Sequence, residues 1–213
     1  MRFTLLTDGS SDRVLLDVLN WLLRQRTKVP FDGLWADLAR LPNPPKGLPA
    51  KIAAAFEFYP CDLLFVHRDA ERESHTVRST EIREALSNIG DYPPVVCVVP
   101  VRMQEAWLLF DEVALRKAAG RPNGKNRLQL PAMSEIEQEP NPKACLHGLL
   151  REASGFSGRQ SKRFRPEIQV HRLAELIDDF SPLYGLPAFQ ALDDDLQAAL
   201  AALGLEPNLQ AHR

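Results

Sequence analysis

Long apolar segments are absent from this sequence of 213 residues. No run approaches the roughly 20 apolar residues that a membrane-spanning helix needs, so we expect no membrane partner. The first residues, MRFTLLTDG, lack the layout of a secretion signal, because their apolar run is short and meets an acid. We therefore expect a cytoplasmic protein.

Cysteine is scarce, and several nucleotide-binding or catalytic motifs are missing. Cys61, Cys97 and Cys145 are widely spaced and match no metal-ligand pattern. Such a set is typical of reduced thiols in a reducing compartment. The sequence has no phosphate-binding P-loop, no dinucleotide-binding glycine signature and no Gly-x-Ser-x-Gly elbow. These absences argue against P-loop nucleotide hydrolysis, dehydrogenation and α/β-hydrolase chemistry.

The composition permits a sizeable core but does not predict a partner. Hydrophobic residues make up 45% of the chain, charged residues make up 25%, and the net charge is −2. Overall charge therefore gives no sign of nucleic-acid binding, although a local basic cluster can supply it. We expect a single α/β domain over residues 1–213, with an acidic-motif core in 1–110 and a helical elaboration with a basic loop in 111–213.

Short apolar runs predict buried strands at residues 3–7, 63–67 and 95–99. The last run, VVCVV, has no polar alternation, which is typical of a strand buried on both faces of a parallel sheet. Helical patterns separate the strands, and residues 27–49 are rich in proline and glycine and predict mostly loop. This order predicts a mainly parallel sheet flanked by helices. We expect helices near residues 12–25, 50–58, 80–88, 143–153, 167–179 and 187–203.

Acidic side chains follow each predicted strand. Asp8 and Asp12 come after the first strand, Asp69 and Glu71 after the second, and Glu105 after the third. Because open α/β sheets bind ligands at the C-terminal ends of their strands, we expect these acids to meet. Converging carboxylates repel one another unless a cation or a shared proton compensates them. Each motif alone also fits a helix cap or a solvated loop, and the three together favour a metal site.

These motifs resemble the Toprim domain. Asp8-Gly9-x-x-Asp12 follows a strand, and Asp69-x-Glu71 follows a later one. The family pattern has Glu-Gly in its first motif and Asp-x-Asp in its second, so this chain has Asp8 where Glu is usual and Glu71 where Asp is usual. The stretch from Val99 to Leu109 is similar to an uncharacterised bacterial branch of Toprim-related proteins, whose members often lie near phage-defence genes.

The resemblance implies a Toprim-like (Rossmannoid) sheet and Mg²⁺ or Mn²⁺ as cofactor. It implies that Asp69 and Glu71 hold the ion, with Asp8 as a further ligand or as a general acid or base. Asp12 and Glu105 are secondary acids in this scheme. Gly9 lets the backbone approach a ligand closely.

Basic residues predict where a phosphate or a nucleic-acid backbone binds. Arg159, Lys162, Arg163 and Arg165 lie within seven residues of one another, in a segment that we expect to be a loop. The alternative is an ordinary solvated loop. Single cations near predicted strand and helix starts are further candidates for phosphate binding. They are Arg68, Arg102 and Lys143. His67 is expected to pack beside the acids rather than to act directly.

The leading functional prediction is Mg²⁺-dependent phosphodiester cleavage, or related phosphoryl transfer, on a nucleic acid. One alternative is a non-catalytic module that binds a nucleotide, a nucleic acid or a protein, because both halves of the acidic motif are altered. Another is a subunit, in phage defence, that is active only beside a partner ATPase. The residues leave DNA or RNA, and hydrolysis or transfer, open.

Overall fold

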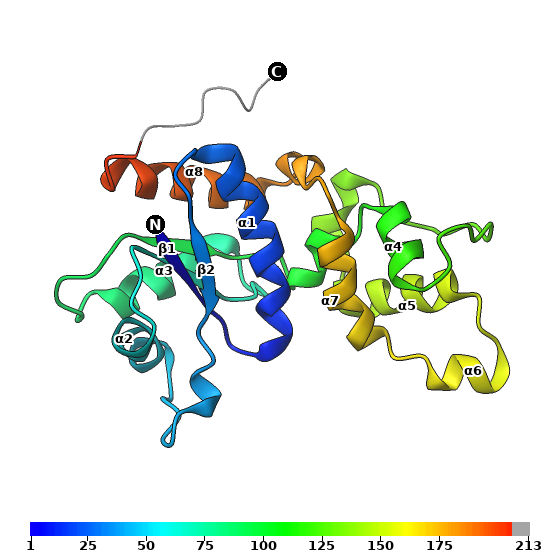
Figure 1. The fold of residues 1–213 in the computed structure, drawn as a ribbon, viewed down its shortest axis with the longest axis horizontal. Coiled ribbons are helices and arrows are strands. Elements are labelled where there is room, and N and C mark those ends of the chain that lie inside the picture. The colour runs from blue at the N-terminus through cyan, green and yellow to red at the C-terminus, as the bar shows by residue number, and fades with distance from the viewer. Residues whose placement is uncertain (206–213) are drawn as a thin grey trace.

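A parallel four-stranded sheet forms the centre of the molecule, in the strand order β2-β1-β3-β4. The computed structural model describes residues 1–205, and Figure 1 shows its fold. The strands are β1 (Arg2–Leu6), β2 (Asp32–Trp35), β3 (Leu63–His67) and β4 (Val95–Val98). All three strand pairs are parallel. The prediction of an α/β fold with a mainly parallel sheet is thus confirmed.

Strand β2 lies within residues 27–49, which are mostly loop as predicted, and the sequence pattern did not reveal it. It pairs with β1 at the edge of the sheet, with Phe3 opposite Gly33. Only alternate residues of β2 are partly shielded from solvent, so the strand lacks the apolar run that marks β1, β3 and β4. Gly33 is needed because a Cβ at this position would lie 2.2 Å from Cζ of Phe3.

Helices cover both faces of the sheet. One apolar cluster joins β1, β3 and β4 to helices α1 and α8, and a second joins the opposite sheet face to α2 and α3. Strands β1, β3 and β4 therefore send alternate side chains into two separate cores, which explains their continuous apolar sequences. The helices on the sheet are α1 (Leu15–Arg26), α2 (Leu48–Phe58), α3 (His75–Leu86) and α8 (Pro187–Ala202).

The remaining helices form a lobe beside the sheet, at the right of Figure 1. Its helices are α4 (Glu112–Ala118), α5 (Pro142–Ser154), α6 (Gly158–Arg163) and α7 (Pro166–Leu176). Side chains of α4, α5 and α7 belong to the same apolar cluster as β1 and α1. Helix α8 then returns to pack on β4.

Two local predictions are corrected by the helix boundaries. Helix α3 begins at His75, ahead of the helix predicted near residues 80–88, because Ser74 caps it by accepting a hydrogen bond from the backbone N–H of Val77. The basic segment 155–166 contains the short helix α6. No helix within residues 1–205 is long and apolar enough to cross a membrane.

Candidate functional site

The acidic site lies where β1 and β3 end, side by side in the centre of the sheet. Strand β2 lies on one side of β1, and β4 lies beyond β3. The chain thus leaves β1 and β3 at the point where the strand order changes direction, which is the usual ligand crevice of open α/β sheets. The first acids follow Leu6, and Asp69 follows His67 in a parallel register.

The loop after β1 is held by hydrogen bonds that fix the position of Asp8. Thr7 Oγ1 donates to the carbonyl of Gly9 over 2.7 Å, and Trp35 Nε1 donates to Thr7 Oγ1 over 3.0 Å. Strand β2 therefore supports the loop through its Trp35 side chain. Asp12 is buried on the following turn, where its Oδ2 accepts the backbone N–H of Gly9 at 3.0 Å.

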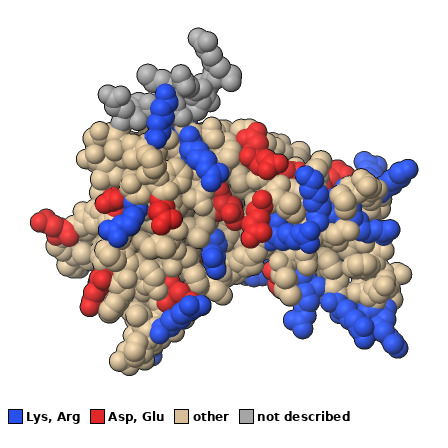
Figure 2. All heavy atoms as spheres, viewed as in Figure 1, with Lys and Arg blue, Asp and Glu red and all other residues tan. Residues whose placement is uncertain are grey.

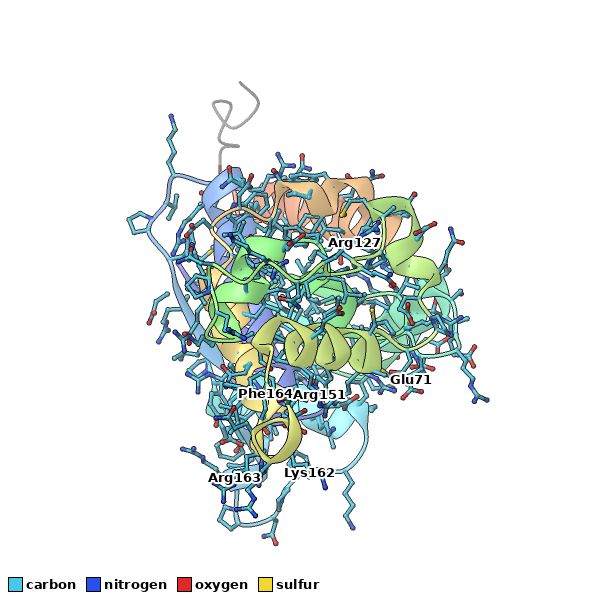
Figure 3. The ribbon with its side chains drawn as sticks, turned by 90° about the vertical axis from the view of Figure 1, so that its right-hand side faces the viewer. Glu71, Arg127, Arg151, Lys162, Arg163 and Phe164 are labelled. Carbon is cyan, nitrogen blue, oxygen red and sulfur yellow. The ribbon has the colours of Figure 1, made fainter. Side chains whose placement is uncertain are left out.

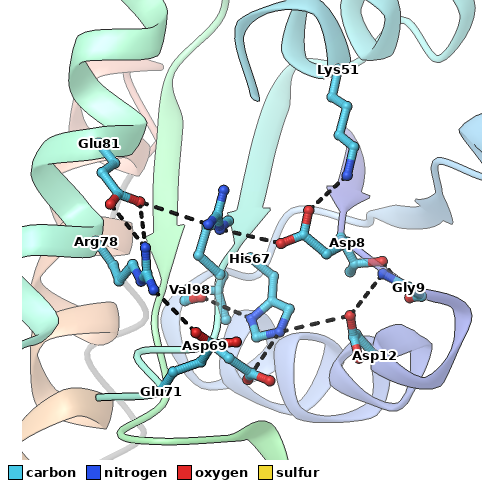
Figure 4. Close-up of polar contacts among 12 residues, drawn as sticks. Asp8, Gly9, Asp12, Lys51, His67, Asp69, Glu71, Arg78, Glu81 and Val98 are labelled. Carbon is cyan, nitrogen blue, oxygen red and sulfur yellow. Dashed lines mark hydrogen bonds and ion pairs between the residues drawn. The ribbon is translucent and has the colours of Figure 1, made fainter. Parts of the chain in front are cut away.

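Asp8 lies between two cations. Lys51 Nζ, from α2, is 2.7 Å from Asp8 Oδ1, and Arg68 Nε, just after β3, is 3.2 Å from Asp8 Oδ2. Figure 4 shows both contacts. The carboxylate of Asp8 is still 49% exposed, so a ligand can reach it. This arrangement places one acid and two cations at the same strand end.

His67 is buried and joins Asp12 to Asp69. Its Nδ1 lies 3.0 Å from the carbonyl oxygen of Val98, and because a carbonyl only accepts, Nδ1 carries a proton. Its Nε2 lies 3.4 Å from Asp69 Oδ1 and 3.9 Å from Asp12 Oδ2 (Figure 4). Burial alone lowers the pKa of His67, but the adjacent carboxylates of Asp69 and Asp12 outweigh it and raise the pKa.

Asp69 is also fixed by the chain that follows β4. Its Oδ1 accepts the backbone N–H of Gln104 at 3.0 Å. The side-chain Oε1 of Gln104 is buried and has no hydrogen-bond partner among residues 1–205. A buried polar atom without a partner is uncommon, and an unseen water or ion is one physical reason for it.

Glu71 lies at the margin of this site and points to α3. Its Oε2 is 3.4 Å from a terminal nitrogen of Arg78, and its side chain is 67% exposed. Glu71 and Arg102 both have positive φ values, 54° and 61°, and the backbone N–H of Glu71 donates to the carbonyl of Arg102. Strained backbone of this kind is concentrated at functional sites.

A chain of alternating charges crosses the edge of the sheet from α2 to α3. Arg68 lies 3.8 Å from Glu81 as well as contacting Asp8, and Arg78 contacts both Glu81 and Glu71. Figure 4 shows this order from Lys51 to Glu71. In the described conformation, Asp8 and Glu71 each have a basic partner, and Asp69 faces His67.

Glu105 is buried next to this site and has a different partner. Burial raises its pKa, the negative charge of Asp69 adds to this, and Lys143 opposes it from 3.5 Å. Lys143 lies in the first turn of α5, so this ion pair connects the sheet edge to the helical lobe. The predicted residues Glu105 and Lys143 are therefore brought together, beside the acids of β3.

The structure brings only part of the predicted set together. Asp8, Asp12, Asp69, Gly9 and Arg68 share the edge of the sheet, and Arg102 contacts Glu71 through its carbonyl. The other predicted phosphate-binding residues lie at the far end of the helical lobe, in and around α6 (Figure 1). They are Arg159, Lys162, Arg163 and Arg165. They stand apart from the acids and belong to a different surface.

Sequence reasoning missed the cations that come from helices. Lys51 of α2 and Arg78 of α3 reach the acids from segments with no recognisable motif. One signal was available, because a helix packed on a parallel sheet begins near the C-terminal end of the strand before it. Lys51 lies in the first turns of α2, and Arg78 lies in the first turn of α3.

A preformed metal centre is not found in the described residues, which include no group of three or more His, Cys, Asp or Glu side chains arranged to hold a metal ion. No protein-family model, curated protein or solved structure matches this chain. The Toprim resemblance and the metal ligands thus stay predictions.

Proposed function

We propose that this chain performs metal-dependent phosphodiester cleavage, or a related phosphoryl transfer, on nucleic acid. The observation that carries the proposal is the meeting of Asp8, Asp12 and Asp69 around His67 and Arg68, at the strand ends where α/β sheets bind ligands. Carboxylates supply ligands for a divalent ion, and adjacent cations supply contacts for a phosphate. Phosphoryl transfer needs both kinds of group.

The donors at this edge suit Mg²⁺ or Mn²⁺ chemically. Mg²⁺ is commonly bound by one or two carboxylates and keeps several waters, so a group of three protein ligands is not required. Asp12 and Asp69 would hold the ion, with Asp8 as a third acid after it leaves Lys51 and Arg68. The backbone N–H of Gln104 binds Asp69, and its side-chain Oε1 is buried without a hydrogen-bond partner. A bound water or ion near Asp69 would account for such an oxygen. Glu71 would stay with Arg78.

The bound ion would stabilise negative charge on the phosphoryl oxygens. Lys51 and Arg68 bind the non-bridging oxygens of the phosphate and exchange their contact with Asp8 for it. Asp8, now without its cations and half exposed, accepts the proton of the attacking water. The water oxygen then forms a bond to phosphorus as the bond from phosphorus to the sugar oxygen breaks. The leaving sugar oxygen takes a proton from solvent, to which Asp8 later returns its own. The buried ring of His67 holds Asp12 and Asp69 in place, and its orientation is fixed by the hydrogen bond from Nδ1 to the carbonyl oxygen of Val98.

The test uses purified protein, several DNA and RNA forms, and EDTA, MgCl₂ or MnCl₂. We expect cleavage only with a divalent ion, and we expect Asp69→Asn to lower the rate by about a hundredfold or more, as loss of one charge-stabilising group typically does. Calorimetric titration with Mn²⁺ should show binding to the unaltered protein and weaker binding to the variant. Glu84→Gln, an exposed acid on α3, is the control.

The competing function is a non-catalytic binding module. It is favoured by the basic partners of Asp8 and Glu71, which neutralise these acids without an ion. In that case no substrate is cleaved under any metal condition, Mn²⁺ does not bind, and nucleic acid still binds. A need for a partner ATPase predicts instead that cleavage occurs only after the partner is added. Participation in phage defence stays a prediction from the family resemblance.

A further inference from the structure

The helical lobe carries an excess of positive charge that the net charge of the chain conceals. Residues 116–165 contain 11 Lys and Arg residues against 4 Glu residues, while the chain as a whole has a net charge of −2. Figure 2 shows Lys and Arg side chains gathered on the part of the surface formed by this lobe. The sheet half is therefore acidic, and the molecule is electrically polar.

Most of these cations face solvent without an acidic partner. Arg116 binds Glu112 and Asn126, and Lys143 binds Glu105. The other basic residues of the segment are exposed and form no ion pair with any residue in 1–205. We call them the basic face: Lys117, Arg121, Lys125, Arg127, Arg151, Arg159, Lys162, Arg163 and Arg165. Repulsion among cations that have no acidic partner destabilises the folded protein, so a bound anion would stabilise it.

The basic face is hollowed and has an aromatic element. A cavity of about 760 Å³ lies between the 120–126 loop and the end of α5, and Arg121, Lys125, Arg151 and Phe156 are among the residues that line it. Phe156 is 41% exposed and packs edge-on against Phe164, with ring centroids 5.9 Å apart. Figure 3 shows Arg151 and Phe164 close to Lys162 and Arg163 of α6.

We propose that the basic face binds a single-stranded nucleic acid, with its phosphates on the arginines and a base stacked on Phe156. Arginine forms paired hydrogen bonds with phosphate, and arginines outnumber lysines on this face. An exposed ring between cations is the arrangement that binds single strands without sequence preference. An acidic protein or an anionic membrane would also be attracted by the positive charge. Neither explains why a cavity lined by arginines lies next to an exposed aromatic ring.

Helix α5 connects the basic face to the acidic site. The inference rests on the proposed function, because it assigns the same nucleic-acid substrate to both surfaces. Lys143, in the first turn of α5, contacts Glu105, and Arg151, near its end, lines the hollow. Eight residues of helix separate them, or about 12 Å at 1.5 Å per residue. A strand held on the basic face needs only a few nucleotides to reach the strand ends of β1 and β3.

The experiment measures binding of fluorescent 20-nucleotide DNA and RNA single strands by anisotropy, in EDTA so that cleavage plays no part. We expect Arg151→Glu/Arg163→Glu to weaken binding by about tenfold or more, and to make the slope of log K against log [salt] shallower by about 1.4, since each phosphate contact contributes about 0.7. Phe156→Ala should weaken single-strand binding by about tenfold and leave duplex binding nearly unchanged.

Arg2→Glu/Lys28→Glu is the matched control. It makes the same change in charge at two exposed positions outside the helical lobe, at the start of β1 and in the segment before β2. Circular dichroism and thermal melting establish that all variants fold. Equal loss of binding in the control, unchanged binding in Arg151→Glu/Arg163→Glu, or equally tight binding of anionic vesicles or polyglutamate would overturn the proposal. If strands bind as described but are never cleaved, the basic face stands and the proposed catalysis fails. If Arg151→Glu/Arg163→Glu cleaves single strands with unaltered kcat/KM, the basic face is refuted and catalysis stands.

Discussion

The acidic side chains of this protein differ in how strongly their negative charge is compensated, because their surroundings differ. Asp8 lies between Lys51 and Arg68, whereas Asp17 on α1 has no cation close enough to offset its burial. Burial raises the pKa of Asp17 to about 6, Glu175 on α7 adds to the effect, and Arg13 and Arg24 only partly oppose it. The interface of α1 and α7 therefore contains a carboxyl group that is held more easily in its neutral form.

This difference predicts how stability depends on pH. The folded pKa of Asp17 lies above its ordinary value of 3.8, so its favourable contribution is complete below about pH 3.8 and is lost as pH rises through about 6. Asp17→Asn should therefore raise the free energy of unfolding at pH 7.5 by about 1 kcal/mol, a value reduced for partial exposure. Urea unfolding at pH 4 and pH 7.5 measures it.

The gain should fall to a small fraction of its size at pH 4, where the carboxyl group of Asp17 is protonated in the folded state and only partly ionised in the unfolded state. Glu175→Gln should give a smaller gain at pH 7.5, because it removes the lesser of the two causes. Asp91→Asn, at an exposed position in the loop before β4, should change nothing at either pH. A gain of the same size at both pH values would show that the amide acts through something other than charge.

At the scale of elements, the sequence indicates strands that are buried on both sides and conceals the one that is not. The runs at β1, β3 and β4 are continuous and apolar, because each strand packs against two cores. Strand β2 is an edge strand with exposed alternate residues, so proline and glycine around it dominate the pattern. Its pairing with β1 depends on tertiary contacts, which a local pattern does not contain.

The candidate site follows the same rule. The meeting of Asp8, Asp12 and Asp69 was predictable, because acids after parallel strands share one edge of the sheet. The partners Lys51 and Arg78 were not, since the direction of a helical side chain depends on how its helix packs. The separation of the α6 cations from the acids was also unpredictable from spacing, because it depends on the path of the chain through α4 and α5.

Gly33 provides a test of how β2 docks on the sheet. A Cβ at Gly33 would lie 2.2 Å from Cζ of the buried Phe3, so Gly33→Ala must displace that ring or the strand. We expect a loss of about 1–3 kcal/mol in the free energy of unfolding, as in other overpacked cores. Because β2 also positions Trp35 against Thr7, tryptophan fluorescence should shift in the folded variant, and the shift should be absent in a Trp35→Phe background.

Gly148→Ala is the matched control for that substitution. Gly148 is exposed in the middle of α5, and a Cβ there would meet no atom within 4 Å. Alanine is the better helix former, so the control should gain about 0.5–1 kcal/mol. Equal effects of the two substitutions, in sign and size, would mean that the contact between Gly33 and Phe3 does not hold β2 in place.

At the scale of the whole molecule, the chain ends by returning to the sheet that it started. Helix α8 packs on β4 and is joined to α1 by Arg26 and Asp193, whose side chains are only 11% and 8% exposed. Arg26 Nε donates to Asp193 Oδ1, and Tyr184 and Gln197 complete the polar contacts around the pair. The first and last helices of the described chain are thus coupled through one buried ion pair.

Breaking this ion pair should therefore destabilise the whole fold rather than one helix. Asp193→Asn removes the carboxylate charge that is hydrogen-bonded to the buried guanidinium of Arg26, and breaking such a pair costs about 3 kcal/mol or more in comparable proteins. The adjacent Asp194→Asn changes an exposed acid on the same helix and should cost less than about 0.5 kcal/mol. Unfolding of both variants should be followed by far-UV circular dichroism, which reports the helices, and by tryptophan fluorescence in a Trp35→Phe background. The remaining tryptophans, Trp21 and Trp107, both pack against Phe189 of α8. We expect Asp193→Asn to unfold in a single transition, at a lower denaturant concentration and seen equally by both probes, because α8 completes the core that β1, α1 and the helical lobe share. If the fluorescence change comes first, α8 detaches from a sheet that is stable without it.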